Sequence, residues 1–259
     1  MIATDNVRVA EDGGIFTVTI DRPPVNAMSF AMFDQLRSVL QQLAHVDRMR
    51  VVVLRTEGDR AWIAGNDVRE FVDLDYGRTI DATACIRTTF NALYECPVPV
   101  IAAIDGAAVG SGLCIASLCD IRIASENAVF ALPEIDVGIL GGARHAFRMV
   151  GNGAARRMMF TAERISAQDA LRLQMVDEVV APDELMPAAY RLAETIARKS
   201  PNAMRLAKAA FNATESLDLQ PGYERECTYS ARSRLHPDAS EAASAWLEKR
   251  QPAFSDHRE

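Results

Sequence analysis

The stretch IDGAAVGSGLCIASLCDIRIAS, residues 104–125, gives the strongest indication of the fold. It places small residues around Gly110 and Gly112 directly before an apolar helical segment, and a strand-like run follows at 119–125. Small residues at a helix N-terminus let a ligand approach backbone N–H groups that have no partner inside the helix. Close packing of a buried helix would use the same glycines, so this stretch alone leaves both interpretations open.

Short apolar runs on either side of this stretch predict the sheet. The runs at 50–56, 98–104 and 119–125 are continuous rather than alternating, which is typical of strands covered on both faces. Helical stretches lie between them, and residues 7–20 predict a hairpin with its turn at Asp12-Gly13-Gly14. This alternation predicts an α/β fold with a mostly parallel sheet.

Helical patterns alone occupy the end of the chain. Ser200-Pro201 starts a helical region that continues to Arg250, with interruptions expected at Pro221-Gly222 and His236-Pro237. We therefore predict a core over residues 1–199 and a C-terminal helical region over 200–259. Because that region has no core of its own, we expect it to pack on the body or on a neighbouring subunit.

Composition excludes several classes of function. The formal net charge is -7 and the isoelectric point is near 5.2, which argues against a surface for nucleic acid or for an anionic membrane. The five cysteines include no CxxC pair, which favours a reducing compartment over a disulfide framework or a zinc site. We expect no metal, no membrane span and, because no signal peptide is recognisable, a cytoplasmic location.

The segment AWIAGNDV, residues 61–68, is the second candidate for chemistry. A short apolar strand is expected to end in the turn Ala64-Gly65-Asn66-Asp67, where Gly and Asn permit a positive φ. Such a turn can direct a backbone N–H outward. An ordinary loop in which Asp67 caps the following helix is the alternative.

The segment FALPEIDVGILGG, residues 130–142, is the third candidate for chemistry. Glu134 follows Pro133 within an apolar run, and apolar surroundings raise the pKa of a carboxyl group towards the value that a general acid or base needs. An exposed loop glutamate is the alternative. If the segment is extended, Asp136 points to the opposite face and is the solvent-facing or structural acid.

In this order and spacing, the three segments resemble the crotonase superfamily of enoyl-CoA hydratases and isomerases. AWIAGND is similar to the family element A-F-x-A-G-x-D, and DGAAVGSGLCIASLCDIRIAS, residues 105–125, is similar to N-G-x-x-x-G-G-G-x-x-x-x-x-x-D. FALPEIDVGIL is similar to the third element, P-E-x-x-x-G. Further similarity covers DRPPVNAM at 21–28, SPNAMRLAK at 200–208 and WLEKRQPAF at the end. The resemblance therefore covers nearly the whole chain.

The resemblance implies a spiral of ββα units with a C-terminal helical region that forms homotrimers or dimers of trimers. It implies an acyl-CoA thioester substrate, with coenzyme A as part of that substrate and no separate cofactor. An oxyanion hole would consist of the backbone amides of Asn66 and Ser111, and Glu134 would be the acid or base. The residues implied in substrate binding are Pro24, Val25, Ala27, Ala64, Asp67 and Val68.

One departure from the family pattern leaves the reaction open. Cys114 stands where the two-glutamate hydratases have their other glutamate, and a neutral thiol is a poor base. A single glutamate favours isomerisation, or a hydratase variant in which another group, such as His145 or Asp136, holds the water. A crotonase-type lyase or thioester hydrolase and a non-catalytic acyl-CoA-binding subunit remain alternatives.

Overall fold

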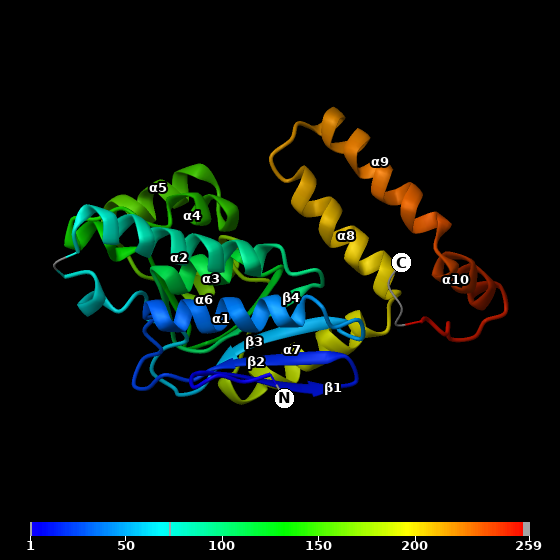
Figure 1. The fold of residues 1–259 in the computed structure, drawn as a ribbon, viewed down its shortest axis with the longest axis horizontal. Helices are drawn as coiled ribbons and strands as arrows, with labels where there is room; N and C mark the ends of the chain where they lie inside the picture. The colour runs from blue at the N-terminus through cyan, green and yellow to red at the C-terminus, as the bar shows by residue number, and fades with distance from the viewer. Residues whose placement is uncertain (1, 73, 256–259) are drawn as a thin grey trace.

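A computed structural model describes residues 2–72 and 74–255, and its largest element is a six-stranded sheet (Figure 1). The strand order is β1 (Val7–Asp12), β2 (Ile15–Ile20), β3 (Val51–Thr56), β4 (Val100–Ile104), β6 (Ile121–Ser125) and β9 (Glu178–Val180). The β1–β2 hairpin is antiparallel and the other pairs are parallel. The predicted hairpin and the three predicted buried strands are thus confirmed.

A second, three-stranded sheet was not expected from the sequence. It consists of β5 (Ala107–Val109), β7 (Val129–Ala131) and β8 (Ile165–Ser166), which are too short to show a periodic pattern. The strand expected before Ala64 is also absent as a continuous element. In its place, isolated bridges join Met28 to Asn66 and Ile63 to Ala108.

Helices cover both faces of the large sheet. On one face lie α1 (Phe30–Leu43), α2 (Tyr76–Tyr94) and α3 (Ser111–Leu118), and α7 (Leu185–Ala197) covers the other (Figure 1). Ser29 caps α1, as expected, by accepting a hydrogen bond from the Met32 N–H. The remaining core segments are α4 (Ala143–Met149), α5 (Asn152–Thr161), α6 (Ala167–Arg172) and the short 3₁₀ helices η1 (Val68–Glu70), η2 (Pro133–Val137) and η3 (Pro182–Glu184).

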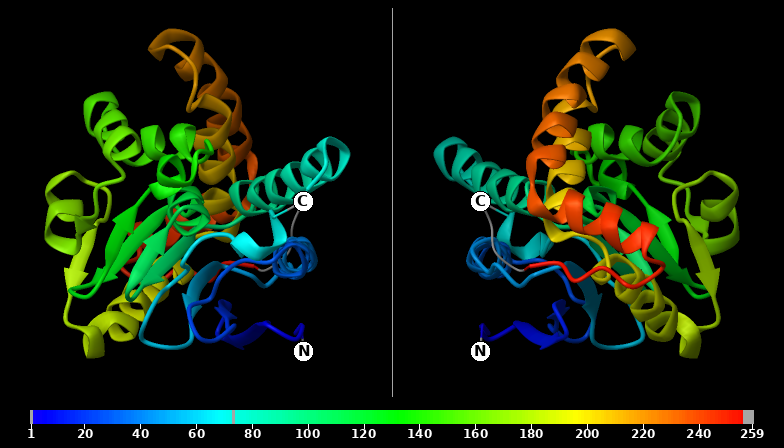
Figure 2. Two further views of the ribbon diagram at one scale, coloured as in Figure 1. Left: turned by 90° about the vertical axis from the view of Figure 1, so that its left-hand side faces the viewer. Right: turned by 90° about the vertical axis from the view of Figure 1, so that its right-hand side faces the viewer.

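The C-terminal helices project from this body (Figures 1 and 2). They are α8 (Pro201–Thr214), α9 (Leu219–Leu235) and α10 (Pro237–Leu247). The interruption expected at His236-Pro237 is confirmed, but the one at Pro221-Gly222 is wrong. Pro221 lies in the first turn of α9, where a backbone N–H has no helical partner and proline is tolerated. The division at residue 199 itself stays a prediction.

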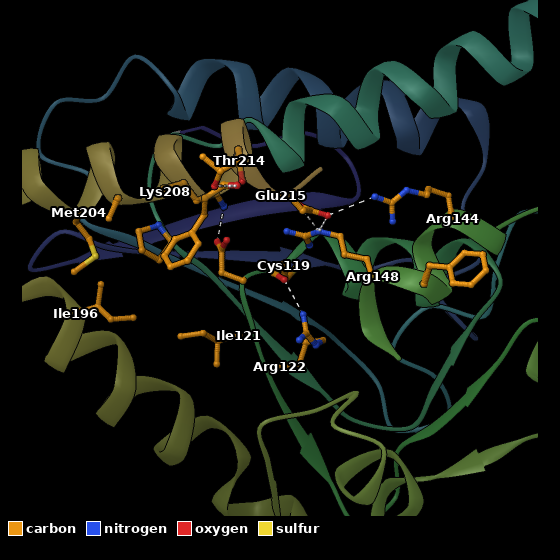
Figure 3. A pocket seen from close by; sticks show the side chains of 16 residues that line it. Cys119, Ile121, Arg122, Arg144, Arg148, Ile196, Met204, Lys208, Thr214 and Glu215 are labelled. Atoms are coloured by element: carbon orange, nitrogen blue, oxygen red, sulfur yellow. Dashed lines mark hydrogen bonds and ion pairs between the residues drawn. The ribbon is translucent and has the colours of Figure 1, made fainter. Parts of the chain in front are cut away.

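Polar contacts connect α8 to the body across a cavity of about 740 Å³ (Figure 3). Lys208 forms an ion pair with Asp120, and Arg148 forms another with Glu215, with 3.1 Å between Nε and Oε2. Several apolar side chains of α8, α9 and α10 are exposed within the part of the chain that the structure describes. We call the following exposed side chains the C-terminal apolar surface: Phe211, Leu219, Tyr223, Leu235, Trp246 and Leu247.

No helix within residues 2–72 and 74–255 is long and apolar enough to cross a membrane.

Candidate active site

Two glycine turns meet at the centre of the site. Gly65 has a φ of +105° and Gly110 a φ of +56°, conformations that glycine adopts without strain. A Cβ atom placed on Gly110 would lie 3.7 Å from the Gly65 Cα atom. Hydrogen bonds from Ile63 N to Ala107 O and from Val109 N to Ile63 O, both 3.0 Å, align the two segments. The residues that follow these glycines, Asn66 and Ser111, are therefore brought close together.

Asn66 and Ser111 each present a backbone N–H without a hydrogen-bond partner in the described part of the chain. Within the described chain, the amides of Asn66 and Ser111 donate to no protein acceptor, whereas the adjacent Asp67 and Gly110 amides bond to Met28 O and Ala131 O. Ser111 is also the first residue of α3, where the helix dipole is positive. Two such donors, side by side, can stabilise a negatively charged oxygen.

Glu134 lies against the same turns. Its Oε1 atom would be 2.9 Å from a Cβ atom on Gly110, and its Cγ atom 3.4 Å from one on Gly141. Burial raises the pKa of Glu134, as the sequence predicts. The segment is not extended, however, but forms η2, so the alternation argument for Asp136 was wrong although that side chain is exposed as expected.

Cys114 extends the apolar side of the site. Its Sγ atom would lie 3.1 Å from a Cβ atom on Gly142, and the residue is 3% exposed. Burial raises the pKa of this thiol, and the nearby charge of Glu134 raises it further. Both effects favour the neutral thiol, which is a poor nucleophile and a poor base.

Buried polar atoms without a partner gather at these turns. Asn66 Oδ1, Ser111 Oγ and Glu134 Oε2 are inaccessible and have no hydrogen bond in the described part of the chain, and the same holds for Trp62 Nε1, three residues before Gly65. Such atoms are rare in native proteins because each one costs free energy. From the sequence, only the backbone amides of Asn66 and Ser111, and not their side chains, were expected to take part in the site. The available signal was Ser111 itself, which stands where the family element has its middle glycine.

The expected substrate-binding residues lie on two adjacent loops. Pro24 is exposed and Val25 and Ala27 are half-buried; the Ala64 N–H donates to Val25 O at 3.2 Å. Val68 is 67% exposed at the start of η1. The structure thus brings these residues together beside the Gly65 turn, and their role in binding stays a prediction.

Asp67 has a structural role that the sequence partly anticipated. It caps η1, and its carboxylate accepts bonds from Arg69 at 2.7 Å and from Arg22 at 2.8 Å. These bonds, first from Arg69 and then from Arg22, hold the pKa of Asp67 well below its usual range. Arg22 also donates to Ala27 O at 2.6 Å, so Asp67 connects the two loops.

We expect Asp67→Asn to lower the free energy of unfolding at pH 7 by about 2 kcal/mol, since hydrogen bonds to a charged group are lost. The lowered pKa means that this stabilisation is present above the ordinary pKa of aspartate and is lost as pH falls through the folded-state value. Thermal melts should therefore show a gap between variant and parent at pH 7 that narrows below about pH 4. Asp21→Asn, which breaks the exposed pair with Arg8, is the control and should change little. Equal melting of Asp67→Asn and the parent at pH 7 would contradict the assignment.

His145 lies in a different environment. Its ring packs 5.1 Å from the Phe90 ring, and it lines a cavity of about 270 Å³ together with Tyr94 and Glu215. Burial lowers the pKa of His145, and the positive charges of Arg144 and Arg148 lower it further. No hydrogen bond or ion pair joins His145 to Glu134 in the described part of the chain. A second acid or base at His145 thus has no geometric support.

No group of three or more His, Cys, Asp or Glu side chains that could hold a metal ion occurs in residues 2–72 and 74–255.

The chain is similar to known proteins along nearly its whole length. The family model described as enoyl-CoA hydratase/isomerase matches residues 10–257. The chain is 34% identical to the short-chain-enoyl-CoA hydratase of Clostridium acetobutylicum, covering 95% of this chain and 96% of that protein. It is 39% identical to a (7aS)-7a-methyl-1,5-dioxo-2,3,5,6,7,7a-hexahydro-1H-indene-carboxyl-CoA hydrolase of Mycobacterium tuberculosis, covering 91% and 96%. Among solved structures, an enoyl-CoA hydratase from Bacillus anthracis superimposes with a TM-score of 0.94 at 32% identity, covering 98% of this chain and 100% of that one.

Proposed function

This chain belongs to the enoyl-CoA hydratase/isomerase family and has the crotonase fold, and on that premise we propose that it converts an unsaturated acyl-CoA through a thioester enolate. The observation that carries the proposal is the pair of unpaired amides, on Asn66 and Ser111, beside the buried carboxyl of Glu134. Coenzyme A enters as part of the substrate.

In this proposal the thioester oxygen lies between the two amides. Negative charge moves onto that oxygen when the substrate becomes enolate-like, and each well-placed donor lowers the barrier by roughly 3 kcal/mol. Both donors belong to the backbone. Side-chain changes at either residue therefore leave the donor in place, whereas proline would remove it.

Glu134 would move the proton. Its raised pKa suits a group that must both take and return a proton near neutral pH. Its Oε1 atom lies close to Gly110, directly before the Ser111 amide, so the proton acceptor and the charge-stabilising donors are adjacent.

An assay of the purified protein on crotonyl-CoA and on a 3-enoyl-CoA tests the proposal. Mass spectrometry distinguishes a hydrated product, which is one water heavier, from an isomer of unchanged mass. Exchange of the α-proton of butyryl-CoA in D₂O detects the enolate itself. A protein that turns over neither substrate and exchanges no proton is not the proposed enzyme.

The pH profile gives a further prediction for Glu134. If its carboxylate takes a proton in the rate-limiting step, kcat/KM falls as pH drops below the raised pKa of Glu134. The acidic limb should therefore lie above pH 4.3, about the ordinary pKa of glutamate. A rate measured from pH 4 to 9 that shows no acidic limb above that value would contradict the role.

Thioester hydrolysis is a second candidate. The relative from Mycobacterium tuberculosis, 39% identical over most of both chains, is named as a hydrolase of a carboxyl-CoA compound. Release of free coenzyme A thiol from the same acyl-CoA substrates would reveal thioester hydrolysis, whereas a mass gain of one water with the thioester intact would reveal hydration.

We also propose that the chain forms homotrimers or dimers of trimers through the C-terminal apolar surface. That surface includes Leu219, Leu235 and Trp246, which are 90%, 84% and 79% exposed in the single chain. Large apolar side chains that are exposed in a single chain are often buried where subunits meet. Light scattering should give three or six times the chain mass of 28.4 kDa. A monomer at micromolar concentration would contradict this assembly.

A further inference from the structure

The cavity between α8 and the body has a lining with an excess of positive charge (Figure 3). Its volume of about 740 Å³ is typical of small-molecule sites. Among the described residues that line it, more side chains are cationic than anionic. The cations are Arg122, Arg144, Arg148 and Lys208, and the anions are Asp120 and Glu215.

Both carboxylates of the cavity are already engaged with cations. Asp120 forms its ion pair with Lys208, and Glu215 accepts a hydrogen bond from Arg148 Nε at 3.1 Å. Arg144 lies 3.9 Å from the same Glu215, at the outer limit of an ion pair, and its side chain is 68% exposed. These pairs leave no carboxylate of the cavity for the remaining cation, Arg122.

Arg122 is a half-buried guanidinium without an ion pair in the described part of the chain. Its Nε atom donates to Met175 O at 2.6 Å and its Nη1 atom to Cys119 O at 2.9 Å, whereas Nη2 has no hydrogen bond there. Asp177 accepts from the Arg122 backbone N–H at 2.8 Å instead. Burial lowers the pKa of Arg122, and the charge of Asp177 offsets part of this effect. A cation held away from water without a paired carboxylate costs free energy, which a bound anion would recover.

The other side of the cavity is apolar. Figure 3 shows Ile196, at the end of α7, and Met204, on α8, on one side, with Arg122, Arg144 and Arg148 on the other. A ligand that suits both sides has an apolar body and an anionic end. A carboxylate is the anion that matches a guanidinium best, since the two planar groups can form parallel hydrogen bonds.

We propose that this cavity binds an aliphatic carboxylate, such as a free medium-chain fatty acid, with its carboxylate on Arg122 and its chain against Ile196 and Met204. Glu134 is not among the described residues that line the cavity, so the site is separate from the acyl-CoA site. The inference goes beyond the proposed reaction and does not depend on it. Because α8 forms one wall and the body the other, an occupied cavity would hold the C-terminal helices against the body.

Isothermal titration calorimetry of the full chain with decanoate tests the proposal. Decanoate should bind saturably at one site per chain and should raise the melting temperature, because a ligand that binds only the folded state stabilises it. The uncharged 1-decanol has the same chain length and should bind at least about 10-fold more weakly, since it loses a hydrogen bond to a charged group.

Variants of the lining locate the binding site. Arg122→Gln should weaken decanoate binding roughly 10- to 100-fold. Because Arg122 also bonds two backbone carbonyls, its replacement lowers stability, and two further variants leave those bonds in place. Arg144→Gln should weaken binding roughly 3-fold, as expected of an exposed charge, and Ala207→Trp, which puts a bulky ring in the lining, should abolish it. Arg172→Gln, at an arginine that is 74% exposed and is not among the lining residues, is the control and should bind as the parent does.

Three outcomes would overturn the proposal. Decanoate does not bind, which also covers the case in which a second copy of the chain fills the cavity. Decanoate binds Ala207→Trp and Arg144→Gln as tightly as the parent, which places the ligand elsewhere, for instance in the acyl-CoA site. Decanol binds as tightly as decanoate, which removes the role of the cations. None of these measurements uses turnover, so a failure of this site and a failure of the acyl-CoA chemistry are seen separately.

Discussion

Replacing Glu134 with glutamine should lower kcat by about 10³-fold on every acyl-CoA that the parent converts, within the usual range for loss of general acid–base catalysis. Glutamine keeps the shape that fills the space beside Gly110 and Gly141, so substrate binding should persist. It cannot take the proton at any pH in the working range. Steady-state kinetics and a direct binding measurement on the same preparation separate the two effects.

The same substitution should stabilise the protein above neutral pH. The pKa of Glu134 is raised on folding, so the folded state binds the proton more tightly and stability falls as pH rises through the folded-state pKa. Glutamine removes this loss, and melting at pH 8 should occur at a higher temperature than for the parent. A catalytic group that lowers stability is a common arrangement in enzymes.

Asp136→Asn is the matched control for Glu134→Gln. Asp136 is an exposed acid two residues along the same 3₁₀ helix, and its replacement removes one negative charge from the same element. Activity should stay close to that of the parent. Equal losses in the two variants would point to a disturbed η2 segment rather than to proton transfer by Glu134.

Gly112→Ala should cause the largest loss of stability among the glycine substitutions considered. A Cβ atom at residue 112 would lie 2.2 Å from Ile63 O and 3.0 Å from Ile63 Cβ. That carbonyl accepts the Val109 N–H bond that aligns the two active-site turns. Overpacking against backbone typically costs about 3 kcal/mol, which for a chain of this size lowers the melting temperature by roughly 10 °C.

Activity should fall with stability in Gly112→Ala, because α3 must move away from the Ile63 segment and separate the Ser111 amide from the Asn66 amide. Gly153→Ala is the control. Gly153 lies in α5, and a Cβ atom there would meet no atom within 4 Å. Alanine should be neutral or slightly stabilising at that position. Similar melting curves for the two variants would contradict the close contact at Gly112.

Most of the architecture was predictable because it depends on local patterns. The Asp12-Gly13-Gly14 turn, the Ser29 cap and the continuous apolar strands each have a physical cause within a few residues. The second sheet was not predictable, since β5, β7 and β8 have two or three residues each and their pairing depends on distant segments. The break expected at Pro221 was wrong because proline interrupts a helix in its interior but is tolerated in its first turn, and sequence alone does not fix where α9 begins.

The site was predictable in its parts but not in its contacts. The glycine turns and Glu134 could be identified from sequence, because backbone freedom and an apolar setting for a carboxyl group are visible there. The position of His145 against Phe90 could not be predicted, because only the fold determines what the side chains of α4 pack against. The unpaired state of the Ser111 hydroxyl likewise depends on neighbours far away in sequence.

The two tryptophans occupy opposite environments, and this gives the protein two distinct optical signals. Trp62 is fully buried, three residues before Gly65, whereas Trp246 is 79% exposed on α10. Indole emission lies at shorter wavelength in an apolar setting than in water, so the single-chain spectrum should contain a blue and a red component. In Trp62→Phe, Trp246 is the only remaining tryptophan of the chain. A blue shift of its emission with rising protein concentration would therefore report burial of the C-terminal apolar surface.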